Sequence, residues 1–176
     1  MTKKIETYPM LPHIAYGLIE EGGFFISLPF RGISLNEYKK LHFGAVSKLR
    51  GNYKSIIDVI LIACIKKTYI KPVDDNGLKL SRSLFDSMVD VEWLLTWANH
   101  NHHDTSNYTQ KIFLDAVVDA GIIVDDNEQY VDRDITHFGN VYYDSITCIL
   151  IGQAYKAMFN DTITSISYDH LIGIIK

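Results

Sequence analysis

The hydrophobic residues between positions 34 and 69 recur at helical spacing. Ser34 can cap this segment, and Glu37 three residues on completes a capping box. Gly51 is placed to bend or interrupt the helix. Lysine and arginine residues occupy the polar side, so the sequence predicts a long basic helix here.

Alternating or continuous apolar runs predict strands elsewhere in the chain. Residues 1–22 show no regular pattern, and Gly22-Gly23 then introduces the first strand. Gly139-Asn140 is a turn signal that predicts a tight hairpin between the last two strands. The strands are expected at residues 24–30, 88–98, 122–124, 129–138 and 141–151.

A second helix is expected at residues 107–120, with Gly121 as the residue that ends it. Its buried stripe would consist of Ile112, Phe113, Ala116, Val117 and Ala120. The pattern predicts an α+β fold with a small mixed or antiparallel sheet, a long basic helix and a helix inserted between two strands. In the last 25 residues, the pattern predicts a short helix at 153–159 and a further strand or helix.

The composition fits a single domain over residues 1–176, since 47% of the residues are hydrophobic. The longest apolar run, residues 56–65, is too short to cross a membrane, and no apolar run of a signal peptide follows the first residues. We therefore expect a soluble, cytoplasmic protein. Cys64 and Cys148 lie in apolar surroundings and are expected to be reduced core residues.

The net charge of -4 hides an uneven distribution. Residues 31–82 contain 11 Lys/Arg against 4 Asp/Glu, whereas residues 83–176 contain 4 against 14. One half could bind a phosphate backbone while the other holds a hard cation, although two solvated surfaces of opposite sign explain the charges equally well. The basic residues that would contact DNA are Lys39, Lys40, Lys48, Arg50 and Lys54.

Candidate chemistry lies between Asp104 and Asp126. Lys111 and Asp115 are four residues apart and share a helical face, and Asp125-Asp126 directly follow three apolar residues. Carboxylates bind Mg²⁺, which keeps several waters and helps to deprotonate one of them, and a nearby lysine can neutralise developing charge. These are the groups that phosphodiester hydrolysis requires, but adjacent acids after a strand are also common in ordinary turns.

The stretch from Leu114 to Asp126, Leu-Asp-Ala-Val-Val-Asp-Ala-Gly-Ile-Ile-Val-Asp-Asp, resembles the signature of the RusA family of Holliday-junction resolvases. The family precedes it with Asp-x-Asp-Asn and a lysine, which here correspond to Asp104-Thr105-Ser106-Asn107 and Lys111. The strand before Pro29 and the opening Ser34-Leu35-Asn36-Glu37-Tyr38 of the basic helix resemble the family as well. The resemblance covers residues 24–150, with 1–22 and 152–176 as extensions.

This resemblance implies a homodimeric endonuclease, cellular or phage-encoded, that resolves four-way DNA junctions by paired nicks with Mg²⁺ or Mn²⁺ and no small-molecule cofactor. Asp104, Asp125 and Asp126 would bind the metal, with Asn107 as a further oxygen ligand. Lys111, Asp104 and Asp126 would be catalytic. Asp115 and Ser106 would support them, and His103 would face DNA phosphate.

The chain departs from the family signature at two places. Ser106 stands where the family has its second acid, and one extra residue separates Asn107 from Lys111. An alignment anchored on Lys111 instead places Thr105 and Asn107 at the acidic positions. Neutral oxygens bind Mg²⁺ less strongly than carboxylates do.

Other classes of function remain open at this point. A protein that kept the fold and lost a metal ligand would bind branched DNA without cutting it. His100, His102 and His103 beside Asp104 are zinc-ligand types, but no second cluster of Cys or His accompanies them. A small-molecule or metal-binding protein unrelated to DNA is the third alternative.

Overall fold

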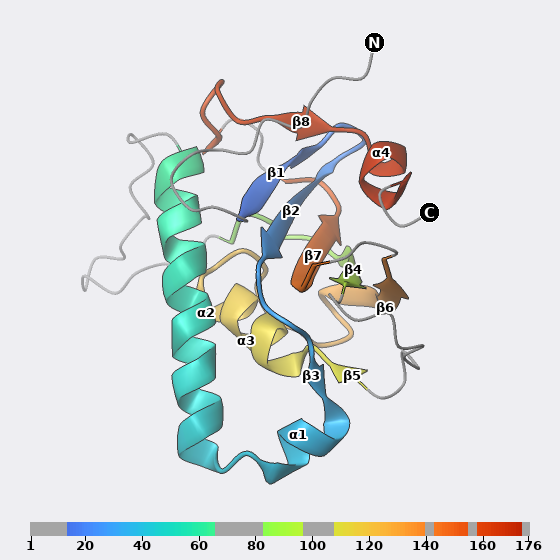
Figure 1. The fold of residues 1–176 in the computed structure, drawn as a ribbon. Helices are drawn as coiled ribbons and strands as arrows, with labels where there is room; N and C mark the ends of the chain where they lie inside the picture. Colours follow the sequence, from blue (N-terminus) through green and yellow to red (C-terminus); the bar gives the residue numbers. More distant parts are fainter. Residues whose placement is uncertain (1–13, 66–82, 97–107, 140–142, 155–157, 174–176) are drawn as a thin grey trace, which may run out of the picture.

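The computed structural model describes residues 14–65, 83–96, 108–139, 143–154 and 158–173, and it has a mixed α+β fold, as predicted (Figure 1). The strands are β1 (Ala15–Ile19), β2 (Gly23–Leu28), β3 (Ile33–Ser34), β4 (Val89–Thr96), β5 (Tyr108–Thr109), β6 (Val131–Phe138), β7 (Ser145–Ile151) and β8 (Ser165–Ile166). The helices are α1 (Leu35–Lys40), α2 (Phe43–Cys64), α3 (Lys111–Asp119) and α4 (Tyr168–Gly173).

Six strands form one sheet in the order β6-β4-β7-β2-β1-β8, while β3 and β5 pair separately. β4 and β6 are parallel, as are β1 and β8, and the other neighbours in the large sheet are antiparallel. Parallel strands need a crossover connection, and α3 lies in the connection between β4 and β6. The predicted mixed sheet with an inserted helix is therefore confirmed.

The predicted hairpin through Gly139-Asn140 is wrong. β4 lies between β6 and β7 and pairs with both of them. The backbone N–H of Gly139 donates to the carbonyl of Leu95 on β4, and a Cβ at Gly139 would lie 2.7 Å from Cγ2 of Thr96. Gly139 thus permits close packing of the end of β6 against β4, and β7 pairs with the other edge of β4 and not with β6.

The hairpin of this sheet lies instead at its other end, between β1 and β2. Residues 1–22 were expected to be irregular, and this is wrong for β1, which pairs with β2 along its full length. Gly22 and Gly23 have φ values of 118° and 155°, and the N–H of Gly22 donates to the carbonyl of Ile19. The two glycines that predicted the start of a strand therefore form the turn between two strands.

The predicted long helix is two helices. The capping box of α1 is confirmed, because Ser34 Oγ accepts the N–H of Glu37 and the Glu37 carboxylate accepts the N–H of Ser34. The break falls at His42 and not at Gly51, since His42 Nδ1 accepts the N–H of Ala45 and starts α2 anew. Within the described residues, no helix is long and apolar enough to cross a membrane.

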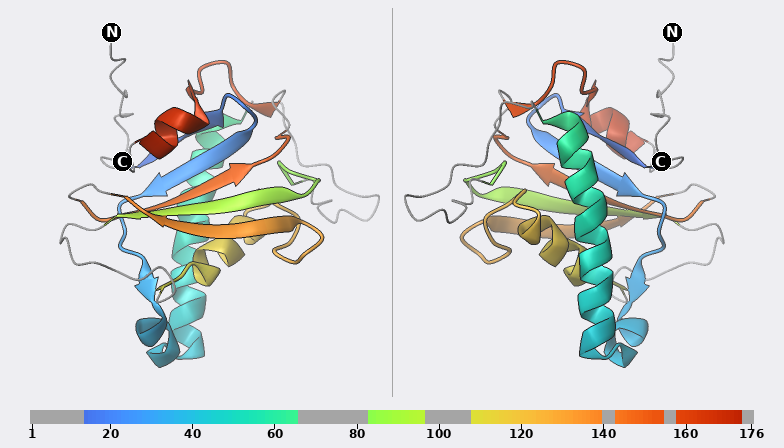
Figure 2. Two further views of the ribbon diagram at one scale, coloured as in Figure 1. Left: turned by 90° about the vertical axis from the view of Figure 1, so that its right-hand side faces the viewer. Right: turned by 90° about the vertical axis from the view of Figure 1, so that its left-hand side faces the viewer.

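The main core lies between one face of the sheet and the helices α2 and α3, and α4 packs against the opposite face (Figure 2). The apolar residues that alternate along β4 all lie buried in this core, as their period of two indicates: Val89, Val91, Trp93 and Leu95. Phe113 of α3 stacks on Tyr53 of α2 at 5.0 Å and contacts Trp93 at 5.4 Å. This aromatic column joins both helices to the centre of the sheet.

The sequence of α3 explains why the helix packs as it does. The five residues of its predicted stripe are all buried, and Gly121 follows the helix with a φ of 75°. The helix begins only at Lys111, because β5 occupies the first part of the predicted range. The strand expected at residues 122–124 is wrong, since Ile123 forms only an isolated bridge to Phe85.

Both cysteines are free and buried, as expected. Burial raises the pKa of Cys64 to about 12 and also raises the pKa of Cys148. Both thiols therefore stay protonated and behave as core residues.

Replacing Phe113 with alanine should remove the middle ring of the aromatic column. We expect the free energy of unfolding, measured with urea, to fall by about 3–5 kcal/mol, because the cavity forms where both helices meet the sheet. Phe43→Ala is the matched control, since Phe43 is 88% exposed and its truncation should change stability by less than about 0.5 kcal/mol. Equal effects of the two changes would contradict the described core.

Candidate active site

The candidate site forms around the first turn of α3, where Lys111 is the first helical residue. Lys111 Nζ lies 2.9 Å from Asp115 Oδ1 and also donates to Asp126 Oδ2. The contact with Asp115 follows from their i,i+4 spacing on one helix. The contact with Asp126 bridges 15 residues and depends on the segment after α3 folding back toward the start of the helix.

The two acids fix the charge of Lys111. Partial burial lowers the pKa of Lys111, but the hydrogen bonds to Asp126 and Asp115 and the charges of both carboxylates raise it by more. The net result is a pKa above the ordinary lysine value. Lys111 is thus held as an ammonium, which suits it to offset negative charge and not to act as a base.

Asp125 stabilises the turn that carries Asp126. Its Oδ1 accepts the backbone N–H of Asp126 at 2.8 Å, and its Oδ2 accepts the side-chain amide of Asn127 at 2.7 Å. Both oxygens of Asp125 therefore take part in local hydrogen bonds, while the carboxylate of Asp126 extends to Lys111. The adjacent acids, which look equivalent in sequence, have different surroundings.

Arg50 reaches this site from α2. It donates from Nε and Nη2 to the two carboxylate oxygens of Asp119, and its Nη1 lies 3.7 Å from Asp115 Oδ2. These bonds raise the pKa of Arg50 and lower that of Asp119. Asp126, Lys111, Asp115, Arg50 and Asp119 thus form a chain of alternating charges, which we call the charge network.

The other residues predicted to contact DNA lie in varied surroundings. Lys39 and Lys40 are exposed in the last turn of α1, and Lys48 is exposed on α2. Lys54 instead pairs with Asp58 one turn away. The structure therefore leaves the three exposed lysines on the surface, whereas Arg50 and Lys54 are engaged by carboxylates.

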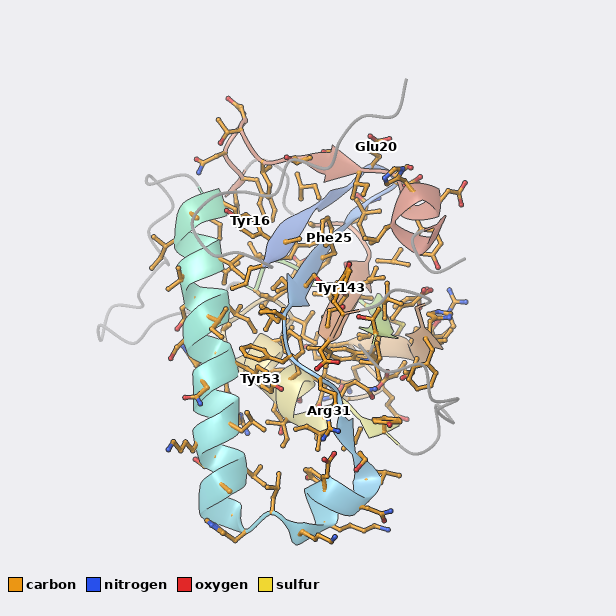
Figure 3. All side chains as sticks on the ribbon, viewed as in Figure 1. Tyr16, Glu20, Phe25, Arg31, Tyr53 and Tyr143 are labelled. Atoms are coloured by element: carbon orange, nitrogen blue, oxygen red, sulfur yellow. The ribbon has the colours of Figure 1, made fainter. Side chains whose placement is uncertain are left out.

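Arg31 is a further basic residue near this region that the sequence did not single out (Figure 3). It is exposed and pairs with Glu37, the acid of the capping box. Pairing of β3 with β5 brings this part of the chain beside Tyr108, just before α3. Burial is the main cause that raises the pKa of Tyr108, and the charge of Arg31 acts in the opposite direction.

Two polar residues beside the site could not be found from local spacing. Asp134 on β6 accepts the indole N–H of Trp93 on β4 at 2.8 Å, across 41 residues of sequence. The pKa of Asp134 is raised, chiefly because its carboxylate is partly buried. The hydrogen bond from Trp93 lowers this pKa, and the charge of Asp126 raises it. Gln110, the residue before Lys111, is buried, and its Nε2 has no hydrogen-bond partner in the described part of the chain.

The donors at this site match a hard cation by type. Asp125, Asp126 and Asp134 offer carboxylate oxygens, and Mg²⁺ needs only one or two of them because it keeps several waters. Among residues 14–65, 83–96, 108–139, 143–154 and 158–173, no group of three or more His, Cys, Asp or Glu side chains is close enough to hold a metal. Asp104, His103, Ser106 and Asn107 lie outside the described residues, as do His100 and His102.

A second polar cluster lies on the opposite face of the sheet. Buried Glu92 accepts the hydroxyl of Tyr168 at 2.7 Å, and its Oε2 lies 3.2 Å from His137 Nε2. Burial and Glu92 together raise the pKa of Tyr168 to about 12, so its hydroxyl remains a donor. The cluster attaches α4 to β4, and it lies on the other side of the sheet from Lys111.

The ion pair of Arg50 and Asp119 should make the stability of the protein depend on pH. Arg50 lowers the pKa of Asp119 in the folded protein, so the ion pair stabilises the fold fully above the ordinary carboxyl pKa of 3.8. This stabilisation is lost as the pH falls through the lowered pKa of Asp119 in the folded state. Asp119→Asn should therefore lower the free energy of unfolding near pH 7 by about 0.2–1 kcal/mol, and the difference from wild type should shrink in acid. Asp132→Asn is the control. If the difference in free energy of unfolding between Asp119→Asn and wild type did not change with pH, the stabilising role of the Arg50–Asp119 ion pair would be contradicted.

The chain matches no family model, and no curated protein is similar to it in sequence.

Proposed function

We propose that the protein is a Mg²⁺-dependent endonuclease of the RusA type, which cuts four-way or other branched DNA junctions by paired nicks. The observation that carries this proposal is the contact of Lys111 with both Asp115 and Asp126. These are the residues at which the sequence resembles the family, and the fold brings the distant acid to the lysine. A lysine beside a carboxylate with further acids nearby is equipment for phosphodiester hydrolysis.

The carboxylates of the site would hold the metal. Asp126 and Asp125 would bind Mg²⁺, or Mn²⁺ in its place, together with Asp104 and Asn107 from the segment before β5. Such an ion, when bound, polarises the phosphate and lowers the pKa of the attacking water. Asp126 would exchange part of its contact with Lys111 for the cation, since a carboxylate can accept from several directions.

Lys111 contributes a fixed positive charge. The raised pKa keeps its ammonium protonated, so it donates hydrogen bonds to a phosphate oxygen and offsets charge that develops there. Asp115 holds the ammonium in place, and Arg50 in turn holds Asp115. Both act as positioning residues in this scheme.

The exposed lysines would bind the DNA backbone. Lys39, Lys40 and Lys48 are exposed on the two helices that follow β3, and His103 would join them from the segment before β5. Cutting two opposing strands requires two active sites, so the proposed mechanism calls for a homodimer. Because phosphate contacts release counterions, binding should weaken steeply with salt.

A second candidate function is junction binding without cleavage. Ser106, in place of an acid, is the observation that favours it, because a neutral ligand weakens the metal site. A protein unrelated to DNA is the remaining alternative, and it would fail to bind a four-way junction even at low salt.

The nuclease proposal predicts symmetric nicks in a synthetic four-way junction with Mg²⁺ and none with EDTA. Asp126→Asn should lower the single-turnover cleavage rate by about 10²-fold or more, because it removes a charged metal ligand and the partner of Lys111. Junction affinity in EDTA should not fall.

Asp58→Asn is the matched control for this experiment. Asp58 also pairs with a lysine but forms no ion pair with Lys111 or Asp126 in the described part of the chain, so its variant should cleave as wild type does. If the wild type binds the junction but makes no nicks in Mg²⁺ or Mn²⁺, the nuclease proposal is contradicted and junction binding without cleavage is favoured.

The exposed lysines should affect binding more than the chemical step. In Lys39→Ala/Lys40→Ala, junction affinity should fall, and the slope of log Kd against log salt should decrease by about 1 for each phosphate that the variant no longer binds. The cleavage rate at saturating protein should stay unchanged. Arg133→Gln is the control, because Arg133 pairs with Asp90 on the face of the sheet opposite Lys111. If junction affinity fell equally in this control, the assignment of the DNA surface to Lys39 and Lys40 would be contradicted.

A further inference from the structure

We propose that Phe43 is a base-stacking residue of the DNA surface, which selects the unstacked bases at the centre of a branched junction. This inference rests on the proposed function, since it names the feature of the substrate that this surface would recognise. Phe43 is the first residue of α2, and its side chain is 88% exposed. No other large hydrophobic residue in the described part of the chain is as exposed.

The elbow between α1 and α2 holds Phe43 in a fixed place outside the core. Leu41 and His42 have extended backbones, and His42 Nδ1 accepts the N–H of Ala45, which fixes the first turn of α2. Leu41 and Val46 pack against the main core on either side of Phe43, whereas the ring of Phe43 lies in solvent. This elbow projects beyond the large sheet (Figure 1). The fold therefore presents the ring to a partner without needing it for packing.

Helical spacing places Phe43 on the face of α2 that carries Arg50. The two residues are seven positions apart, so they share a face of the helix and lie roughly 10 Å from each other along its axis. Arg50 pairs with Asp115 and Asp119 of α3. Asp115 in turn pairs with Lys111. A DNA strand that follows this face of α2 could thus contact both Phe43 and the charge network.

The charges around Phe43 favour a polyanion. Lys39 and Lys40 precede it in the last turn of α1, Lys48 follows it on α2, and all three are exposed. Over α1 and the first two turns of α2 the only acid is Glu37, which is already ion-paired. Unstacked nucleic acid binds where basic side chains contact its phosphates and an aromatic ring stacks on a base. The elbow supplies both kinds of group.

A protein partner at Phe43 is the competing explanation. Single exposed apolar residues are common on protein surfaces, and aromatic residues are enriched at protein interfaces. The other exposed large apolar residues of α2, Val59 and Ile62, lie in its last two turns, so they do not extend an apolar patch around Phe43. Lysines flank Phe43 instead, and protein interfaces are depleted in lysine. These surroundings favour nucleic acid.

Phe43→Ala should weaken binding to a synthetic four-way junction by about tenfold, because stacking on one base is lost. Affinity for a linear duplex of the same sequence should change by less than about twofold, since its bases are already stacked on one another. The slope of log Kd against log salt should stay the same, because no phosphate contact is removed. Phe43→Trp should retain junction binding, whereas Phe43→Leu, which has no ring, should lose it. Titrations in EDTA at low salt measure these affinities.

Ile62→Ala is the matched control, since Ile62 is 79% exposed at the other end of the same helix and should leave junction affinity unchanged. Urea unfolding would verify that each variant folds, and sedimentation velocity would measure its oligomeric state. Equal junction affinity of Phe43→Ala and wild type overturns the inference, as does an equal loss of affinity for junction and duplex. A changed oligomeric state of Phe43→Ala also overturns it, because Phe43 would then belong to a protein interface.

The wild-type protein distinguishes this failure from failure of the proposed function. If the wild type and Phe43→Ala bind and cut the junction equally, the nuclease stands and only the role of Phe43 falls. If Phe43→Ala selectively loses junction binding but the wild type makes no nicks, base stacking stands and the nuclease falls. If the wild type binds neither junction nor duplex at low salt, both proposals fall.

Discussion

The positively charged side chains of Arg50 and Lys111 organise the region around α3, because each of them pairs with two carboxylates. Arg50 joins α2 to α3 through Asp119 and Asp115, and Lys111 joins the start of α3 to Asp126 in the following segment. Exposed ion pairs of this kind contribute little to the free energy of folding, roughly 0–1 kcal/mol each. The stability comes from the apolar core beneath them. The ion pairs determine where the charged groups lie relative to one another, and this placement is what a metal-dependent site needs.

The charge network also changes how the charge asymmetry of the chain is understood. The sequence suggested a basic half and an acidic half that act separately. Arg50 belongs to the basic half but forms ion pairs with two acids of the other half, Asp119 and Asp115. Within the described residues, exposed lysines remain on α1 and on the first half of α2. The two kinds of charge are therefore interleaved at the candidate site.

The central strand β4 separates two polar regions. Trp93 faces the helices and holds Asp134, while the neighbouring Glu92 faces the other side and holds Tyr168 and His137. Because side chains alternate along a strand, these two adjacent residues lie on opposite faces of the sheet. One face supports the candidate site, and the other attaches α4 to the sheet.

The sequence alone determined the elements whose signals are local. The capping box at Ser34, the buried stripe of α3 and the core-facing side of β4 follow from periodicity and caps, which depend on residues a few positions apart. Tertiary structure decided the rest, because strand order and side-chain pairing depend on distant segments. It placed β4 between β6 and β7 where a turn signal predicted a hairpin, and it set Asp134 against Trp93. It also carried Asp126 to Lys111, a contact between residues 15 positions apart that only the folded chain could make.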